Sequence, residues 1–327
     1  MRVIAPYVAT LFVFHAFPAV AGGQSTGQSR AAIFLTLPAS ARALALGDAY
    51  GAIANDEGAL FYNPAQLAQV HSVTGGGSLQ RYIAETTLGA FAVAAPIGRG
   101  TVAVGMQVLD YGSADEFVPV DGSAGQQGAP TGGRVSAQDL ALMVGYGTAF
   151  GERHALRVGV TVKYARQHVA NYSGGTAAAD VGVAYSLRSG WEVAGAVQQL
   201  GPNLTLASVT AQLPWTWRVD AASPVLRGER FTLRGMVEAR QWSGGLATGV
   251  LAAEGTWRDG TTGAVLAARA GYALRGSGDD RSPMTVGGGV TLGRFSVDYA
   301  YEGFELLGGA THRVGIRYAA ARVVTAH

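Results

Sequence analysis

Cysteine is absent from the 327 residues of this chain, and charged side chains are scarce. The absence of cysteine excludes disulfides, thiolate metal sites, cysteine nucleophiles and a lipidated N-terminal cysteine. Charged residues make up 14% of the chain and hydrophobic residues 48%, and the mean hydropathy is +0.19. This composition is apolar for a soluble domain, so we expect much of the surface to face something other than water.

Long apolar runs and basic clusters are also missing. After the N-terminus, no uninterrupted apolar segment approaches the ~20 residues that a membrane-spanning helix needs, which argues against a helical membrane protein. The formal net charge of +2 is spread along the chain without a cluster of Lys and Arg. Nothing therefore indicates a nucleic-acid partner.

The first residues have the form of a secretory signal peptide. Arg2 precedes an uncharged apolar stretch that ends in a small-residue A-x-A cleavage signature. A retained anchor helix is disfavoured because Pro6 and Pro18 interrupt a stretch already near the lower length limit. We assign residues 1–21 to the signal peptide and 22–30 to a flexible leader.

From residue 71 onward the sequence alternates with a period of two. In the segment 157–167, Val158, Val160, Val162 and Tyr164 share one face, and the other face is polar or small. Turn signals divide the region 71–320 into about fourteen candidate strands, an even number, as in bacterial barrels. The candidate strands are 72–82, 86–96, 101–111, 137–149, 155–169, 176–187, 191–200, 213–222, 231–242, 247–257, 263–274, 283–293, 294–303 and 311–320.

The connections between these strands alternate in length. If the chain enters from the periplasm, one side receives only short turns, and the other receives the longer loops, of which 112–136 is the longest. This asymmetry is typical of a transmembrane β-barrel. A secreted all-β sandwich or propeller is the main alternative, but it explains neither the low charge nor the alternation. We predict an all-β fold, a transmembrane antiparallel β-barrel.

Tryptophan placement is consistent with this interpretation. Trp191 and Trp257 lie at strand ends on the short-turn side, and Trp215, Trp217 and Trp242 lie near the opposite ends. Aromatic girdles at the two membrane interfaces would place tryptophans at both ends of the strands in this way.

Residues 31–70 differ from the rest because they are predicted to be helical. Ser40 is a plausible N-cap for a helix that breaks near Asn55-Asp56, and a second turn ends at Asn63 because Pro64 follows it. We expect this segment to be a hatch in the lumen, since a barrel of this size needs filling. The candidate residues of the hatch and of an apolar pocket are Leu44, Leu60, Phe61, Tyr62, Asn63, Pro64 and Leu67. For Leu60, Phe61, Tyr62 and Leu67, ordinary packing of the hatch is the alternative role.

Charged residues of both signs fall on the face predicted to line the lumen. Such a set most often forms ion pairs that hold a hatch, and a solute-selective pore lining is the alternative. The residues are Arg157, Lys163, Arg218, Asp220, Arg234, Glu238, Glu254, Arg269, Asp298, Glu302, Arg313 and Arg317.

No catalytic site, metal site or cofactor is predicted. A G-x-S-x-G match at 23–27 lies in the leader, outside the strand-to-helix turn that gives this motif its chemistry. His71, His154, His168 and His312 lack metal-ligand spacing, and we take them as interfacial polar residues. The adjacent carboxylates Asp279-Asp280 are expected to be solvated.

Several segments resemble a known family. The stretch FLTLPASARALALGDAYGAIANDEGALFYNPAQLA, and later FSVDYAYEGFELLGGATHRVGIRY, resemble the PorV/PorQ family of outer-membrane proteins, which belongs with the FadL-type fatty-acid transporters. The resemblance spans nearly the whole mature chain and implies fourteen strands with an N-terminal hatch. The chain departs from many outer-membrane barrels by continuing past Tyr318 into a tail at 321–327, instead of ending in an aromatic residue.

Two functions remain open. The resemblance implies an outer-membrane component of protein secretion or cell-surface attachment, whose partners would be secreted cargo or other parts of a type IX secretion system. The alternative is a FadL-like transporter that carries a hydrophobic ligand across the outer membrane of a Gram-negative-type bacterium. Either protein would also contact outer-membrane lipid.

Overall fold

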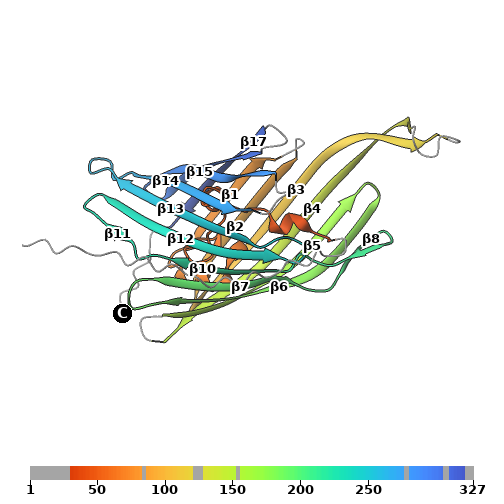
Figure 1. Cartoon of the computed structure of the whole chain (residues 1–327). Coiled ribbons are helices and arrows are strands. Elements are labelled where there is room, and N and C mark those ends of the chain that lie inside the picture. The colour runs from red at the N-terminus through yellow and green to blue at the C-terminus, as the bar shows by residue number, and fades with distance from the viewer. Residues whose placement is uncertain are drawn as a thin grey trace, which may run out of the picture.

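The computed structural model describes residues 30–82, 86–120, 128–151, 155–275, 280–304 and 309–320. The predicted signal peptide, most of the leader and the tail at 321–327 lie outside these ranges, as do His154 and Asp279. Within them, fourteen long antiparallel strands form a closed barrel (Figure 1). These strands are β1 Thr74–Arg81, β2 Thr87–Ile97, β3 Gly100–Pro119, β4 Gly128–Phe150, β5 Leu156–Val169, β6 Tyr172–Ser186, β7 Glu192–Leu200, β10 Thr216–Ala222, β12 Phe231–Trp242, β13 Thr248–Arg258, β14 Val265–Leu274, β15 Arg281–Leu292, β16 Phe295–Phe304 and β17 Gly309–Ala319.

The barrel closes because its first and last strands pair. β1 is antiparallel to β17, with Thr74 opposite Ala319, and every other long strand pairs with its sequence neighbours. Between β7 and β10 the chain makes a small hairpin of β8 Leu204–Leu206 and β9 Val209–Ala211. The two-residue strand β11 Leu226–Arg227 pairs with β12, which also pairs with β10. The predicted number and order of strands are confirmed.

The main departure from the predicted strands is at 112–136, which we expected to be a loop. β3 and β4 instead continue as a two-stranded ribbon, which projects beyond the other strands at the upper right of Figure 1. Register shifts after Asp110 and Asp115 bend this ribbon, and Gly112 has a positive φ of 74°. Such irregularities are typical of β-bulges, which increase the local twist.

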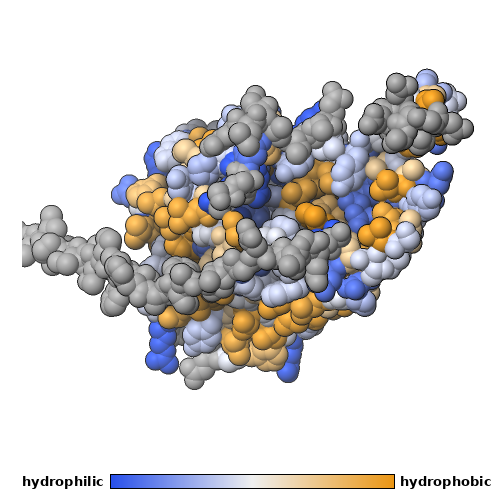
Figure 2. Space-filling view, turned by 45° about the vertical axis from the view of Figure 1, so that its right-hand side comes forward, coloured by the Kyte–Doolittle hydropathy of each residue, from blue (hydrophilic) through white to orange (hydrophobic). Residues whose placement is uncertain are grey.

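The two faces of the barrel wall differ as the period-two pattern predicts. On β5, Val158, Val160, Val162 and Tyr164 point outward and are 36% to 57% exposed, whereas Lys163 is buried. Hydrophobic side chains cover much of the barrel's sides in Figure 2, and hydrophilic ones lie in the hollow between the loops. The wall therefore presents an apolar surface outward and a polar one to the lumen. No helix in the described ranges is both long and apolar enough to cross a membrane.

The N-terminal segment lies inside the barrel and forms four short helical pieces. They are the 3₁₀ helices η1 Ile33–Thr36 and η2 Pro64–Gln69 and the α-helices α1 Ala41–Leu44 and α2 Ala59–Tyr62. The helical hatch in the predicted fold is therefore present, but its first helix is shorter than expected. The backbone is left-handed at Gly47 (φ 62°) and Asp48 (φ 75°), which ends the helical run before Asn55.

The predicted ends of these helical pieces are correct where side chains cap them. The Ser40 hydroxyl accepts a hydrogen bond from the backbone N–H of Ala43 at 3.0 Å, as an N-cap does. The α2 helix stops at Asn63, whose side chain then accepts a bond from the N–H of Ala65.

Candidate functional site: the lumen and its hatch

One side of the hatch packs on a wall of glycines. Gly105, Gly145, Gly147, Gly159 and Gly182, on β3 to β6, contact the hatch so closely that an added Cβ would lie 2.0–2.7 Å from the nearest hatch atom. Their hatch partners are Leu60, Asn63, Pro64 and Leu67, four of the predicted site residues. These four residues pack the hatch against the wall, so Leu60 and Leu67 have the packing role that is the alternative to an apolar pocket.

Asn63 also binds the barrel backbone. Its amide nitrogen donates to the carbonyl oxygens of Val183 and Gly195 at 3.3 and 3.4 Å. Because Asn63 is fully buried, these bonds satisfy an amide that would otherwise be costly to bury.

The opposite side of the hatch is held by charge. The guanidinium of Arg42, on α1, makes two hydrogen bonds to the carboxylate of Glu254 on β13, at 2.8 and 2.9 Å. Arg269 continues the network, binding Glu254 and Asp298 at 2.6 Å each. Arg317 on β17 binds Asp56 of the hatch. Glu254 and Arg317 therefore form ion pairs with the hatch, and Arg269 and Asp298 extend this network within the wall.

Other predicted lumen charges pair within the wall. Lys163 lies 2.7 Å from Asp180, and Arg157 pairs with Glu192. Arg313 is fully buried and donates to Gln80 at 2.9 Å and to the hydroxyl of Ser78 at 2.7 Å.

Two adjacent acids of the hatch titrate differently. Burial would raise the pKa of Asp56, but Arg317 and Arg42 outweigh that effect and lower it. The pKa of Glu57 is raised from 4.5 to about 7, first by burial and then by the charge of Asp56. Glu57 lies against β1, where a Cβ at Gly76 would be 2.2 Å from its carboxylate. The hatch therefore contains a carboxyl group that titrates near neutral pH.

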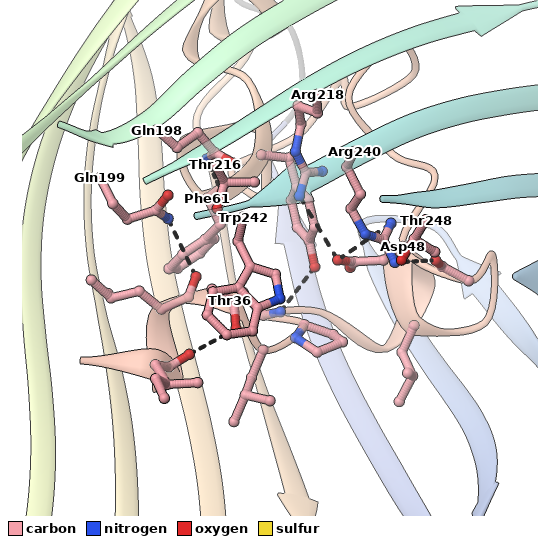
Figure 3. Close-up of a pocket in the computed structure, with 18 of the residues that line it drawn as sticks. Thr36, Asp48, Phe61, Gln198, Gln199, Thr216, Arg218, Arg240, Trp242 and Thr248 are labelled. Carbon is pink, nitrogen blue, oxygen red and sulfur yellow. Dashed lines mark hydrogen bonds and ion pairs between the residues drawn. The ribbon is translucent and has the colours of Figure 1, made fainter. Parts of the chain in front are cut away.

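A cavity of about 220 Å³ lies between the hatch and the long-loop end of the barrel. It is lined by strand residues near that end, such as Gln198 and Trp242, and by hatch residues that include Leu44, Phe61 and Tyr62. Figure 3 shows Arg218 and Arg240 reaching from their strands toward Asp48 of the hatch, at 3.9 and 4.0 Å. The hatch side of the cavity thus combines apolar side chains with the carboxylate of Asp48, and the wall side is polar and includes Arg218 and Arg240.

Glutamines fix the hatch backbone at the edge of this cavity. Gln107 donates to the carbonyl oxygens of Phe34 and Leu37 at 3.1 and 3.2 Å. Gln198 donates to the carbonyl of Phe61 at 2.8 Å, and Gln199 to that of Leu35 at 3.4 Å. These three glutamines are not among the site residues predicted from the sequence.

Trp242 was assigned to an outer aromatic girdle, and this assignment is wrong. Its side chain lines the cavity, as does that of Thr36 (Figure 3). Counting by two along β12 from Glu238 through Arg240 reaches Trp242, so the strand period could have shown that all three face the lumen.

Three buried polar atoms around the cavity have no hydrogen-bond partner among the described residues. They are Oδ1 of Asp48, Oε1 of Gln199 and Nε of Arg218. Buried polar atoms are normally satisfied, so the packing around the cavity leaves the hydrogen-bonding capacity of these three atoms unused.

A second cavity of about 460 Å³ lies at the short-turn end. Hatch residues including Ile53 and Gln66 line it, together with Glu192, Pro224 and Arg227 of the barrel. The hatch therefore contributes to a cavity at each end of the lumen.

No protein-family model and no curated protein matches this sequence. Solved structures do match its fold. A FadL homologue of Pseudomonas aeruginosa is 11% identical with a TM-score of 0.56, covering 86% of this chain and 98% of its own. The monoaromatic hydrocarbon channel CymD is 11% identical with a TM-score of 0.57, and the match covers 89% of this chain and 99% of CymD. The Pseudomonas putida toluene transporter TodX is 11% identical with a TM-score of 0.55, and the match covers 86% of this chain and 97% of TodX. At this identity the likeness shows the fold alone, a FadL-like barrel.

Proposed function

We propose that this protein is an outer-membrane channel that takes up a small hydrophobic or amphipathic molecule. The cavity above the hatch carries this proposal, because it combines apolar hatch residues, Phe61 and Tyr62, with the tryptophan and cations of the wall. Ligand pockets are commonly apolar with a few polar groups that set orientation. In this proposal the long loops face outside the cell and the short turns face the periplasm.

The structural neighbours support the choice of cargo class. Two of them are described as a monoaromatic hydrocarbon channel and a toluene transporter. We propose the same general class for this chain, with a polar group on the ligand, because Arg218 and Arg240 line the cavity beside Phe61. The molecule would bind there first and then pass the hatch toward the second cavity.

The test of ligand binding uses Trp242 as the reporter. A brominated fatty acid that enters the cavity should quench the fluorescence of this indole, and toluene should compete with it. Trp242→Phe should lose most of the quenching, whereas the matched control Trp191→Phe, at the short-turn end of the outer wall, should retain it. Equal quenching in both variants would place the probe on the barrel exterior and contradict the proposal.

A secretion or surface-attachment platform is the second candidate. The ribbon formed by the ends of β3 and β4 supports it, because it projects from the barrel and exposes Phe117 (59%) and Val118 (47%). Exposed apolar groups of this kind can mark a partner surface. Shortening the ribbon by deleting 113–134 should leave probe binding unchanged if the protein is a channel. Under the platform alternative, the deletion should abolish surface attachment of secreted proteins in the native host.

A further inference from the structure

The short-turn end of the barrel carries an arginine at each connection in the described ranges. Arg99 lies between β2 and β3, Arg188 between β6 and β7, and Arg294 between β15 and β16. Arg227 and Arg230 lie between β10 and β12, and Arg258 ends β13. These six residues, which we call the arginine ring, are all exposed.

The charge of this end is not balanced locally. Two carboxylates, Glu229 and Asp259, lie in the same connections, so the described turns sum to +4 (six arginines less two acids). The whole chain has a formal charge of +2, so the rest of the molecule sums to −2. None of the six arginines forms an ion pair with a carboxylate of the described residues. Asp259 accepts bonds from the N–H and hydroxyl of Thr262 in its own turn.

Each connection places an outward-facing apolar side chain next to its arginine. The neighbours are Ile97, Trp191, Leu226, Phe231, Trp257 and Phe295, which are 42% to 61% exposed on the barrel wall. Aromatic residues at a barrel rim mark the boundary between hydrocarbon and headgroups. Arg227 also lines the second cavity. The other five arginines lie in or beside turns just beyond that boundary, at the depth of lipid phosphates.

The opposite end of the barrel does not share this pattern. Its exposed arginines, which include Arg81, Arg134 and Arg166, are interspersed with exposed carboxylates such as Asp110 and Asp115. The positive charge is thus specific to the short-turn end and is not a general feature of the surface.

We infer that the arginine ring binds the headgroups of anionic phospholipids in the leaflet at the short-turn end. A guanidinium can donate two parallel hydrogen bonds to a phosphate, and Arg is less strongly hydrated than Lys, so it suits this contact. A basic cluster at a membrane surface is attracted to anionic lipid over distances within a Debye length. The ring fixes the depth and orientation of the barrel, and its role is independent of what the lumen carries.

The test measures which lipids the folded protein retains. The full mature chain is reconstituted in nanodiscs of equimolar phosphatidylcholine and phosphatidylglycerol, extracted in mild detergent, and analysed for bound lipid by mass spectrometry. We expect phosphatidylglycerol to be enriched several-fold over phosphatidylcholine. The enrichment should disappear when extraction is done at about 1 M salt, where the Debye length is ~3 Å.

Two matched triple variants separate the ring from net charge. R188Q/R258Q/R294Q should lose most of the enrichment, and R81Q/R134Q/R166Q, with the same change in charge, should keep it. A shift in gel mobility on boiling shows that each variant is folded. If R188Q/R258Q/R294Q does not fold, the single variants R188Q, R258Q and R294Q are measured instead. An unenriched wild-type protein, as expected if the ring serves an acidic protein partner, would overturn the inference. Equal loss in both triples would overturn it too.

Discussion

The carbonyl oxygen of Pro64 lies so close to Gly159 that a Cβ at position 159 would be 2.3 Å from it. No side chain other than hydrogen fits there unless the hatch or strand β5 moves. The contact joins the hatch to the barrel wall. Adding one methyl group at this position therefore tests whether the hatch closes the lumen.

Gly159→Ala should therefore displace the hatch. Overpacking of a tight contact typically costs 1–3 kcal/mol, and the barrel's own backbone pairing does not depend on Pro64. We expect a folded, heat-modifiable barrel with higher conductance in planar bilayers. Gly195→Ala is the control, since its nearest neighbour would be 3.7 Å away, and it should conduct like the wild type. Unchanged conductance in Gly159→Ala would mean that this contact does not hold the hatch closed.

Arg42→Met should loosen the charged side of the hatch. The substitution removes both bonds to Glu254 and leaves that carboxylate with Arg269 alone. Because partners remain, we expect a loss of about 1–3 kcal/mol, less than for a fully broken buried pair. Hydrogen exchange of amides in α1 and α2 should become faster, while exchange in the barrel strands stays constant. Arg166→Met removes an arginine from the outer wall and should leave amide exchange unchanged in the hatch helices and in the barrel strands. Equally fast exchange of the hatch helices in this variant would indicate a general effect of charge.

Glu57 should make the hatch sensitive to pH. Its carboxyl pKa is about 7 in the folded protein and near 4.5 when the group is free, so the folded state holds the proton more tightly. The resulting stabilisation is fully present below pH 4.5 and is lost as the pH rises through 7. This difference corresponds to about 3 kcal/mol at most.

Glu57→Gln keeps the side chain neutral and should remove that dependence. Hydrogen exchange of α2, compared between the variant and the wild type at each pH, should agree near pH 4.5. At pH 8 the variant should be better protected. Protection that falls equally in both proteins between these values would assign the pH effect to another group.

A single engineered disulfide should lock the hatch. A Cβ at Gly315 of β17 would lie 3.4 Å from the Cβ of Ala41 on α1, close to the ~3.8 Å typical of disulfides. Because the chain has no cysteine, A41C/G315C can form only this one intramolecular bond. Ligand quenching of Trp242 should be the same in the oxidised and reduced forms, since the cavity lies above the lock. Loss of quenching on oxidation would mean that the lock distorts the cavity.

The barrel was predictable because the bilayer imposes one rule on every strand. On β5, for example, Val158 to Tyr164 alternate between lipid and lumen, and the strand ends were placed within a few residues. The ribbon of β3 and β4 escaped prediction because it lies beyond the apolar wall, where both faces are exposed and the alternation no longer has a cause.

The site was predictable only in part. Leu44, Phe61 and Tyr62 line the cavity, but the sequence could not show which hatch residues would instead pack on the wall glycines. Gln198 and Gln199 are consecutive, and period two puts only one of them in the lumen. A register shift opposite Asp180 and a positive φ of 57° at Gln199 bury both. A local irregularity of this kind depends on tertiary contacts.

Passage of a hydrophobic molecule past the hatch is tested most directly by uptake of N-phenylnaphthylamine, a dye that becomes fluorescent on reaching phospholipid. Gram-negative cells that produce the protein are compared with the same cells producing A41C/G315C, before and after reduction. We predict faster uptake with the wild type than with an empty vector, slow uptake with the oxidised lock, and recovery on reduction. Uptake no faster than in the empty-vector cells, or uptake unaffected by the lock, would contradict it.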